Sequence, residues 1–161
     1  MKYLVIPFAM LAAGSAFANQ TVSKSVDVFA NIPTAEFYVE QDGTWMTQPQ
    51  ELVYNAVTGA LRPFDGQRMV ARSTAGAIQA RLDSAPIMTS GSDSIGLTVS
   101  VNNVTLSTVN AEILSEDDAK NRTFMPFKIE AVAAGTNGYA AGNYQGTVNM
   151  TFETPVPTVG P

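Results

Sequence analysis

The side chains that could carry out catalysis in this chain are carboxylates, because it contains neither histidine nor cysteine. Ser-His and Cys-His nucleophile pairs are therefore excluded, and most zinc sites would lack ligands. Glu116, Asp117 and Asp118 could form a glycosidase pair or bind calcium, but no apolar pocket sequence surrounds them. They also lack the spaced ligands and central glycine of a calcium loop. We interpret them as a solvated acidic loop and predict no enzyme, metal or cofactor.

Two other features could bind a small molecule. Trp45, beside Asp42 and Gly43, could stack on a sugar ring, although such a residue more often packs at the rim of a core. The glycine-rich segment 135–142 lacks the Lys-Ser/Thr ending and the following helix of a phosphate loop. Neither feature points to a particular ligand.

The first 18 residues have the pattern of a secretory signal peptide. Lys2 supplies a positive charge, Tyr3–Ala13 is an apolar run, and Ala16-Phe17-Ala18 places small residues where a signal peptidase cuts. The apolar run is shorter than the ~20 residues of a membrane span. We expect cleavage after Ala18 and export of the mature chain without membrane insertion.

The remaining chain of about 140 residues suits one domain with its own core. Its richness in valine, threonine, serine, glycine and asparagine favours β-structure. Without cysteine, the fold depends on packing and strand pairing. The formal net charge is −5 and no basic cluster is present, which argues against nucleic acid or an anionic membrane as a partner.

Short alternating segments separated by turns predict an antiparallel β-sandwich. Ile95–Val101 is the strongest internal strand, and Asn102-Asn103 after it predicts a two-residue hairpin because asparagine tolerates positive φ. We expect 111–121 to form one helical turn or a surface loop. The other predicted strands are 35–40, 52–54, 67–74, 77–83, 104–108 and 125–133, with loops at 55–66 and 90–94.

The segment Thr21–Ile32 alternates with period 2, as a strand with one buried face does. Lys24 interrupts that face near its free end, and Pro33 follows the segment. Such a strand could pair within its own domain or reach into a neighbouring one. Its apolar face consists of Val22, Val26, Val28, Ala30 and Ile32.

A second alternating segment, Asn143–Glu153, runs for eleven residues and predicts the last strand. Pro155, Pro157 and Pro161 follow it and cannot continue a central strand. An exposed flat edge at this strand would promote aggregation unless something covered it. One face carries Tyr144, Gly146, Val148, Met150 and Phe152.

In the order and spacing of these pieces, the chain resembles the major pilins of alpha-type (class 5) chaperone–usher fimbriae, which include colonisation-factor pilins. The matching pieces are a signal peptide, the strand Lys24–Ile32, the segment Leu52–Tyr54, the strand–turn–strand unit Ile95–Thr108, and Ala-Gly-Asn-Tyr-x-Gly-x-Val at Ala141–Val148. The tail after Glu153 departs from that pattern.

The resemblance implies an incomplete immunoglobulin-like antiparallel β-sandwich that a donor strand from another subunit completes. Residues 1–18 would be the signal peptide, 19–33 the donor-strand extension and 34–161 the pilin domain. The donor residues would be Val22, Val26, Val28, Ala30 and Ile32. The acceptor groove would include Tyr144, Val148, Met150 and Phe152.

The implied partners are other copies of the chain, a periplasmic chaperone, an outer-membrane usher and a tip adhesin subunit, which places the chain in fimbriae at the cell surface. Strand addition of this kind is a general mode of recognition. The residues alone leave an alternative open, in which the chain is a monomeric exported carbohydrate-binding sandwich whose N-terminal strand pairs within its own sheet.

Overall fold

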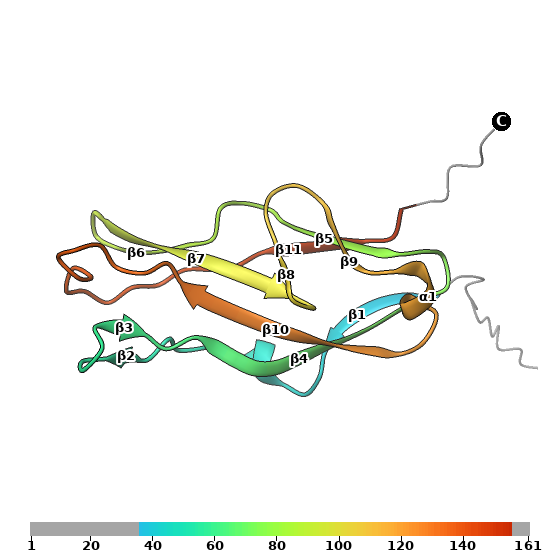
Figure 1. Ribbon diagram of the computed structural model, residues 1–161, viewed down its shortest axis with the longest axis horizontal. Coiled ribbons are helices and arrows are strands. Elements are labelled where there is room, and N and C mark those ends of the chain that lie inside the picture. Colours follow the sequence, from blue (N-terminus) through green and yellow to red (C-terminus); the bar gives the residue numbers. More distant parts are fainter. Residues whose placement is uncertain (1–35, 156–161) are drawn as a thin grey trace, which may run out of the picture. The chain divides into compact units, whose positions relative to one another are not determined.

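The computed structural model describes residues 36–155, so Thr21–Ile32 lies outside the described residues. Apart from one small hairpin, their strands form two facing antiparallel sheets (Figure 1). The first sheet contains, in order, β1 (Phe37–Gln41), β4 (Phe64–Ser73), β10 (Thr123–Ala131), β7 (Asp93–Val101) and β6 (Ile87–Ser90), with β8 (Val104–Thr105) also paired to β7. The second contains β11 (Met150–Glu153), β5 (Ile78–Leu82) and β9 (Ala111–Leu114). The predicted all-β sandwich is confirmed.

The core lies between the two sheets and follows the predicted alternation. Ile78, Ala80 and Leu82 of β5 are almost completely buried. From the opposite sheet, Val99 of β7 and Met125 of β10 are buried against them. Among residues 36–155, no helix has the length and apolar character needed to cross a membrane.

The hairpin at Asn102-Asn103 is confirmed. Both asparagines have positive φ, 51° and 64°, and the short strand β8 pairs back onto β7. The Asn102 side chain also donates a hydrogen bond to the Ile113 carbonyl oxygen at 2.6 Å. The left-handed conformation that this turn requires is the reason for asparagine here.

The predicted loop 55–66 is wrong at both ends. A small hairpin forms from β2 (Tyr54–Asn55) and β3 (Ala60–Leu61), and β4 begins at Phe64 rather than at residue 67. Gly66, interpreted as a loop signal, has φ 79° and lies where the pairing of β4 with β10 shifts register. A glycine with positive φ inside a strand is typical of a β-bulge.

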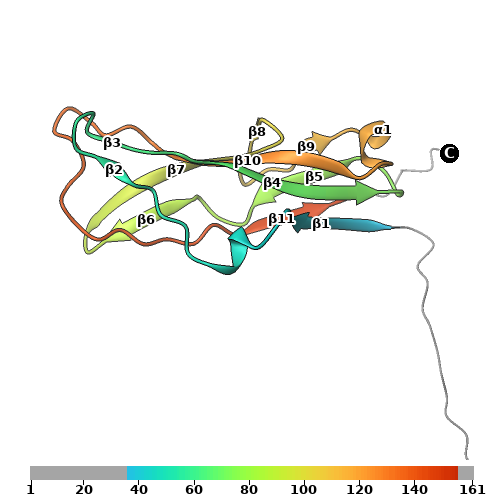
Figure 2. The same ribbon diagram turned by 90° about the horizontal axis from the view of Figure 1, so that it is seen from below.

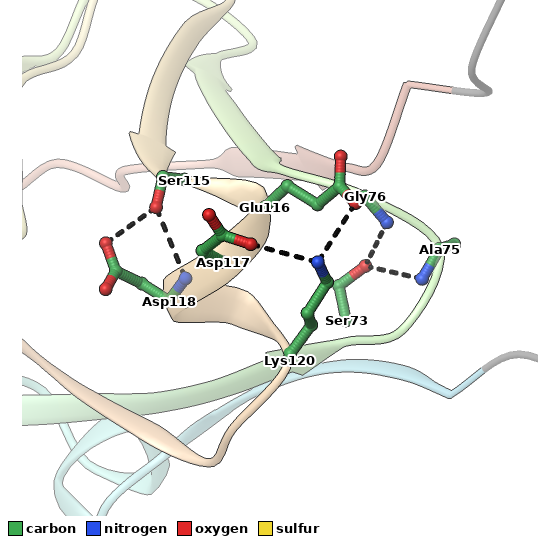
Figure 3. A network of polar contacts seen from close by, with 8 residues as sticks. All are labelled: Ser73, Ala75, Gly76, Ser115, Glu116, Asp117, Asp118 and Lys120. Atoms are coloured by element: carbon green, nitrogen blue, oxygen red, sulfur yellow. Dashed lines mark hydrogen bonds and ion pairs between the residues drawn. The ribbon is translucent and has the colours of Figure 1, made fainter.

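Two further strands were missed. β6 ends within the predicted loop 90–94 and pairs with the start of β7. β9 occupies the beginning of 111–121, and only the rest forms the expected helical turn, α1 (Glu116–Ala119). Ser115 caps α1 by accepting a hydrogen bond from the Asp118 N–H at 3.2 Å (Figure 3). A good cap lets a single turn persist after a strand.

The last predicted strand, Asn143–Glu153, is only partly a strand. β11 covers Met150–Glu153 and pairs with β5, whereas the preceding residues make one isolated bridge, Gln145 with Thr89 of β6. The segment therefore passes from the edge of one sheet to the edge of the other. From Val148 to Phe152 the alternation reflects one apolar face, whereas the segment as a whole does not form one continuous ladder.

We expect Asn103→Val to lower the free energy of unfolding by about 1–2 kcal/mol, because a β-branched residue is strained at positive φ. Asn103→Gly is the matched control and should stay near the parent value. Chemical denaturation of both variants, followed by circular dichroism, measures the difference. Equal stability of the two variants would contradict the assigned turn.

Candidate functional site

A groove of about 940 Å³ opens along the side of the sandwich where β1 and β11 lie (Figure 2). Val39 of β1 lines one wall, and Met150 and Phe152 of β11 line the other. Phe127 and Ile129 of β10 contribute to the lining from the first sheet. The groove therefore lies between the edges of the two sheets.

Both strands beside the groove are edge strands. Within residues 36–155, β1 pairs only with β4 and β11 pairs only with β5. Successive antiparallel pairings run from β1 across to β6, and the segment that leads into β11 makes an antiparallel bridge to β6 through Gln145 and Thr89. As a result β1 and β11 run in opposite directions (Figure 2). A strand placed between them could pair with both.

Alternating hydrogen bonds define which backbone groups of β1 face the groove. The Asp42 N–H donates to the Arg68 carbonyl at 3.0 Å, and the Thr74 N–H donates to the Glu36 carbonyl at 2.9 Å. In an antiparallel pair such residues alternate with residues whose N–H and C=O point the other way. The backbone groups of Phe37, Val39 and Gln41 consequently point away from β4.

The same reasoning applies to β11. The Asp83 N–H donates to the Asn149 carbonyl at 3.0 Å, in the register that pairs Thr151 with Arg81. The odd-numbered residues of β11 therefore bond to β5. The backbone groups of Met150 and Phe152 are left pointing toward the groove.

Apolar side chains fill the lining but leave it open. Val39, Val148, Met150 and Phe152 pack against the core and remain only partly buried. Three of the four residues expected in an acceptor groove thus line this one. Val39 was not singled out in the sequence, although the alternating segment 35–40 carries it.

An aromatic cluster forms part of the groove lining. The Trp45 ring lies 4.7 Å from the Phe127 ring and 5.6 Å from the Phe64 ring, between centroids. Its indole N–H donates to the Arg68 carbonyl at 3.2 Å. Trp45, in the short 3-10 turn η1 (Trp45–Thr47), is therefore a packing residue of the groove.

Tyr144, the fourth expected groove residue, lies elsewhere. It lines a second hollow of about 290 Å³ together with Tyr139, and its hydroxyl donates to the Ala140 carbonyl at 3.0 Å. Gly146, two residues later, does line the groove. A Cβ at Gly146 would overlap the Ile87 carbonyl oxygen, so only glycine allows the chain to lie this close to β6. The expected donor residues, Val22–Ile32, lie outside the described residues.

The acidic segment has a structural explanation. Lys120 Nζ lies 2.9 Å from Asp117 and 3.3 Å from Glu116 (Figure 3), and these hydrogen bonds, that to Asp117 foremost, raise the pKa of Lys120. Asp118 accepts a hydrogen bond from the Ser115 hydroxyl at 2.6 Å. Within residues 36–155, no group of acidic side chains has the arrangement of a metal site.

An antiparallel β-sandwich with an apolar groove between two unpaired edges defines a class of protein that can accept a strand. Residues 22–153 match the family described as CS1 type fimbrial major subunit. The chain belongs to this family. It is therefore a pilin, a structural subunit that polymerises with other subunits in a surface fimbria.

A solved structure agrees in fold. The CooA pilin subunit from enterotoxigenic Escherichia coli superposes with a TM-score of 0.58 at 19% sequence identity, covering 75% of this chain and 87% of that one. No curated protein sequence matches the chain. The resemblance to colonisation-factor pilins inferred from the sequence is confirmed.

We expect Gly146→Ala to separate the segment 143–149 from β6, because the added methyl group meets the Ile87 carbonyl. Overpacking of this kind costs about 1–3 kcal/mol of unfolding free energy. Gly135→Ala is the matched control, since an added Cβ there has no neighbour within 4 Å. Chemical denaturation compares the two variants, and equal stability would contradict the close approach.

Proposed function

We propose that the chain polymerises by donor-strand exchange, in which residues 19–33 of one copy enter the groove of the next. The observation that carries this proposal is the pair of edges beside an apolar groove that have no partner in the described part of the chain, residues 36–155. The donor residues are Val22, Val26, Val28, Ala30 and Ile32, and the acceptor residues are Val148, Met150 and Phe152. Tyr144, apart from the groove, would not contact the donor.

The energetics favour a slot with two edges. Ordering two successive residues of a donor costs about 2–4 kcal/mol of backbone entropy. Only one of the two side chains faces the groove, and its burial returns about 1.5–3 kcal/mol. Hydrogen bonds contribute about 1 kcal/mol each. Two successive donor residues carry two N–H and two C=O groups, and all four can be bonded only when an edge is present on each side of the donor. Side-chain burial alone therefore does not hold the donor.

The same groove explains the need for assembly partners. An apolar slot between free edges promotes aggregation if it stays uncovered. In the proposed pathway a periplasmic chaperone covers the groove first, and the donor of the next subunit replaces it at an outer-membrane usher. A tip adhesin subunit would end the filament. The mature chain would travel through the periplasm to the cell surface after removal of residues 1–18.

A chain lacking residues 19–32 should still accept a donor but should not form filaments. We expect a synthetic peptide of residues 20–33 to bind this deletion variant, measured by calorimetry, and to raise its melting temperature. The Val28→Asp peptide is the matched control. It should bind more weakly by about tenfold or more, because a carboxylate replaces a buried valine.

Electron microscopy of the deletion variant provides the decisive outcome. Filaments formed without residues 19–32 would exclude donor-strand exchange. A stable monomer of the full chain that binds no peptide would instead favour the alternative, an exported carbohydrate-binding sandwich.

A further inference from the structure

We propose a specific register for the donor strand, an inference that rests on the proposed donor-strand exchange. The donor runs antiparallel to the segment 146–152. Val26 lies opposite Phe152, Val28 opposite Met150, Ala30 opposite Val148 and Ile32 opposite Gly146.

The direction follows from the lengths of the two edges. Because β1 and β11 run in opposite directions, an inserted strand is antiparallel to one and parallel to the other. β1 lines the groove only with Val39–Gln41, before the turn at Gly43, whereas residues 146–150 and Phe152 line the other side. Antiparallel pairing is the more stable per residue, so it belongs on the longer edge.

Two residues of the donor fix the register. Lys24 and Pro33 bracket the apolar stretch, and neither suits the middle of an apolar slot. A shift by two residues in one direction would place Lys24 against Phe152. The opposite shift would bring Pro33 opposite Thr147, inside the lining of the groove, where its rigid ring would interrupt the donor strand.

In the proposed register both residues lie beyond the groove. Pro33 falls opposite Gln145, past Gly146. Lys24 falls opposite Thr154, whose hydroxyl accepts a hydrogen bond from the buried Ser73 hydroxyl at 3.3 Å. This end of the sandwich thus offers polar partners to the one charged residue on the apolar face of the donor.

Side-chain sizes also match. Ala30, the smallest of the inward donor residues, meets the β-branched Val148. Ile32, the largest, meets Gly146, which has no side chain and cannot acquire one without overlapping β6. The reverse direction would oppose Ile32 to Phe152 and lose this complementarity.

Cysteine pairs can read the register directly, because the chain contains no cysteine of its own. Thr151 bonds its backbone to β5, so Asp27 and Thr151 would form a non-hydrogen-bonded pair with outward side chains. The Cβ atoms of such pairs are about 4.5–5.5 Å apart, close to disulfide geometry. We expect filaments of the full chain with Asp27→Cys and Thr151→Cys to give a ladder on a non-reducing gel that reductant collapses to monomer.

Three matched pairs test the alternatives. Asp27→Cys combined with Asn149→Cys or Glu153→Cys reports a shift by two residues, and combined with Thr147→Cys it reports the reverse direction. A ladder from any of these pairs, or filaments with no ladder from all four pairs, would overturn the register. If the first pair prevents assembly, Ser25→Cys with Glu153→Cys reads the same register. Filaments from the 19–32 deletion variant would instead exclude donor exchange itself.

A size exchange gives an independent readout. Ala30→Leu should reduce filament yield, because the larger side chain overpacks against Val148. Val148→Ala in the same chain should restore the yield, whereas Met150→Ala should not. Restoration by Met150→Ala, or by neither change, would contradict the proposed pairing of Ala30 with Val148.

Discussion

The rest of the structure depends on two backbone edges, those of β1 and β11, which within residues 36–155 have no partner on the side that faces the apolar groove. Backbone N–H and C=O groups point toward this groove from both sides, those of Val39 in β1 and those of Met150 and Phe152 in β11. Buried backbone groups left unpaired are costly, so such a groove favours the addition of a further strand. The open edges therefore agree with membership of a family of fimbrial subunits, which assemble with one another.

Several local features keep the groove open. The Trp45 indole N–H donates a hydrogen bond to the Arg68 carbonyl beside the end of β1, and its ring packs on Phe127. The aromatic rings therefore line the groove rather than fill it. On the other side, Gly146 lets the segment before β11 lie against β6, which anchors the wall to the first sheet. A larger residue at Gly146 would change the width of the groove.

Sequence periodicity predicted the structural features that depend on the pattern of a single strand. The buried faces of β5 and β7 and the asparagine turn after β7 carry local signals, and so does the apolar face that contains Val148. Periodicity did not predict the features that depend on pairing between segments far apart in the sequence. Tyr144 shares a face with Val148 in the sequence, yet the bridge of Gln145 to β6 places it in another hollow, and the bulge at Gly66 resembled a loop.

The short connection between the proposed donor and the domain limits which groove the donor could reach. Ser73 pairs with Phe37 and donates a hydrogen bond to Thr154, so β1 begins at the Phe152 end of the groove. In the proposed register Ile32 lies at the Gly146 end, about 20 Å away along the strand. The five steps from Ile32 to Phe37 span at most about 17 Å even when fully extended. In the proposed register self-insertion is therefore blocked, so the donor would have to come from a second copy.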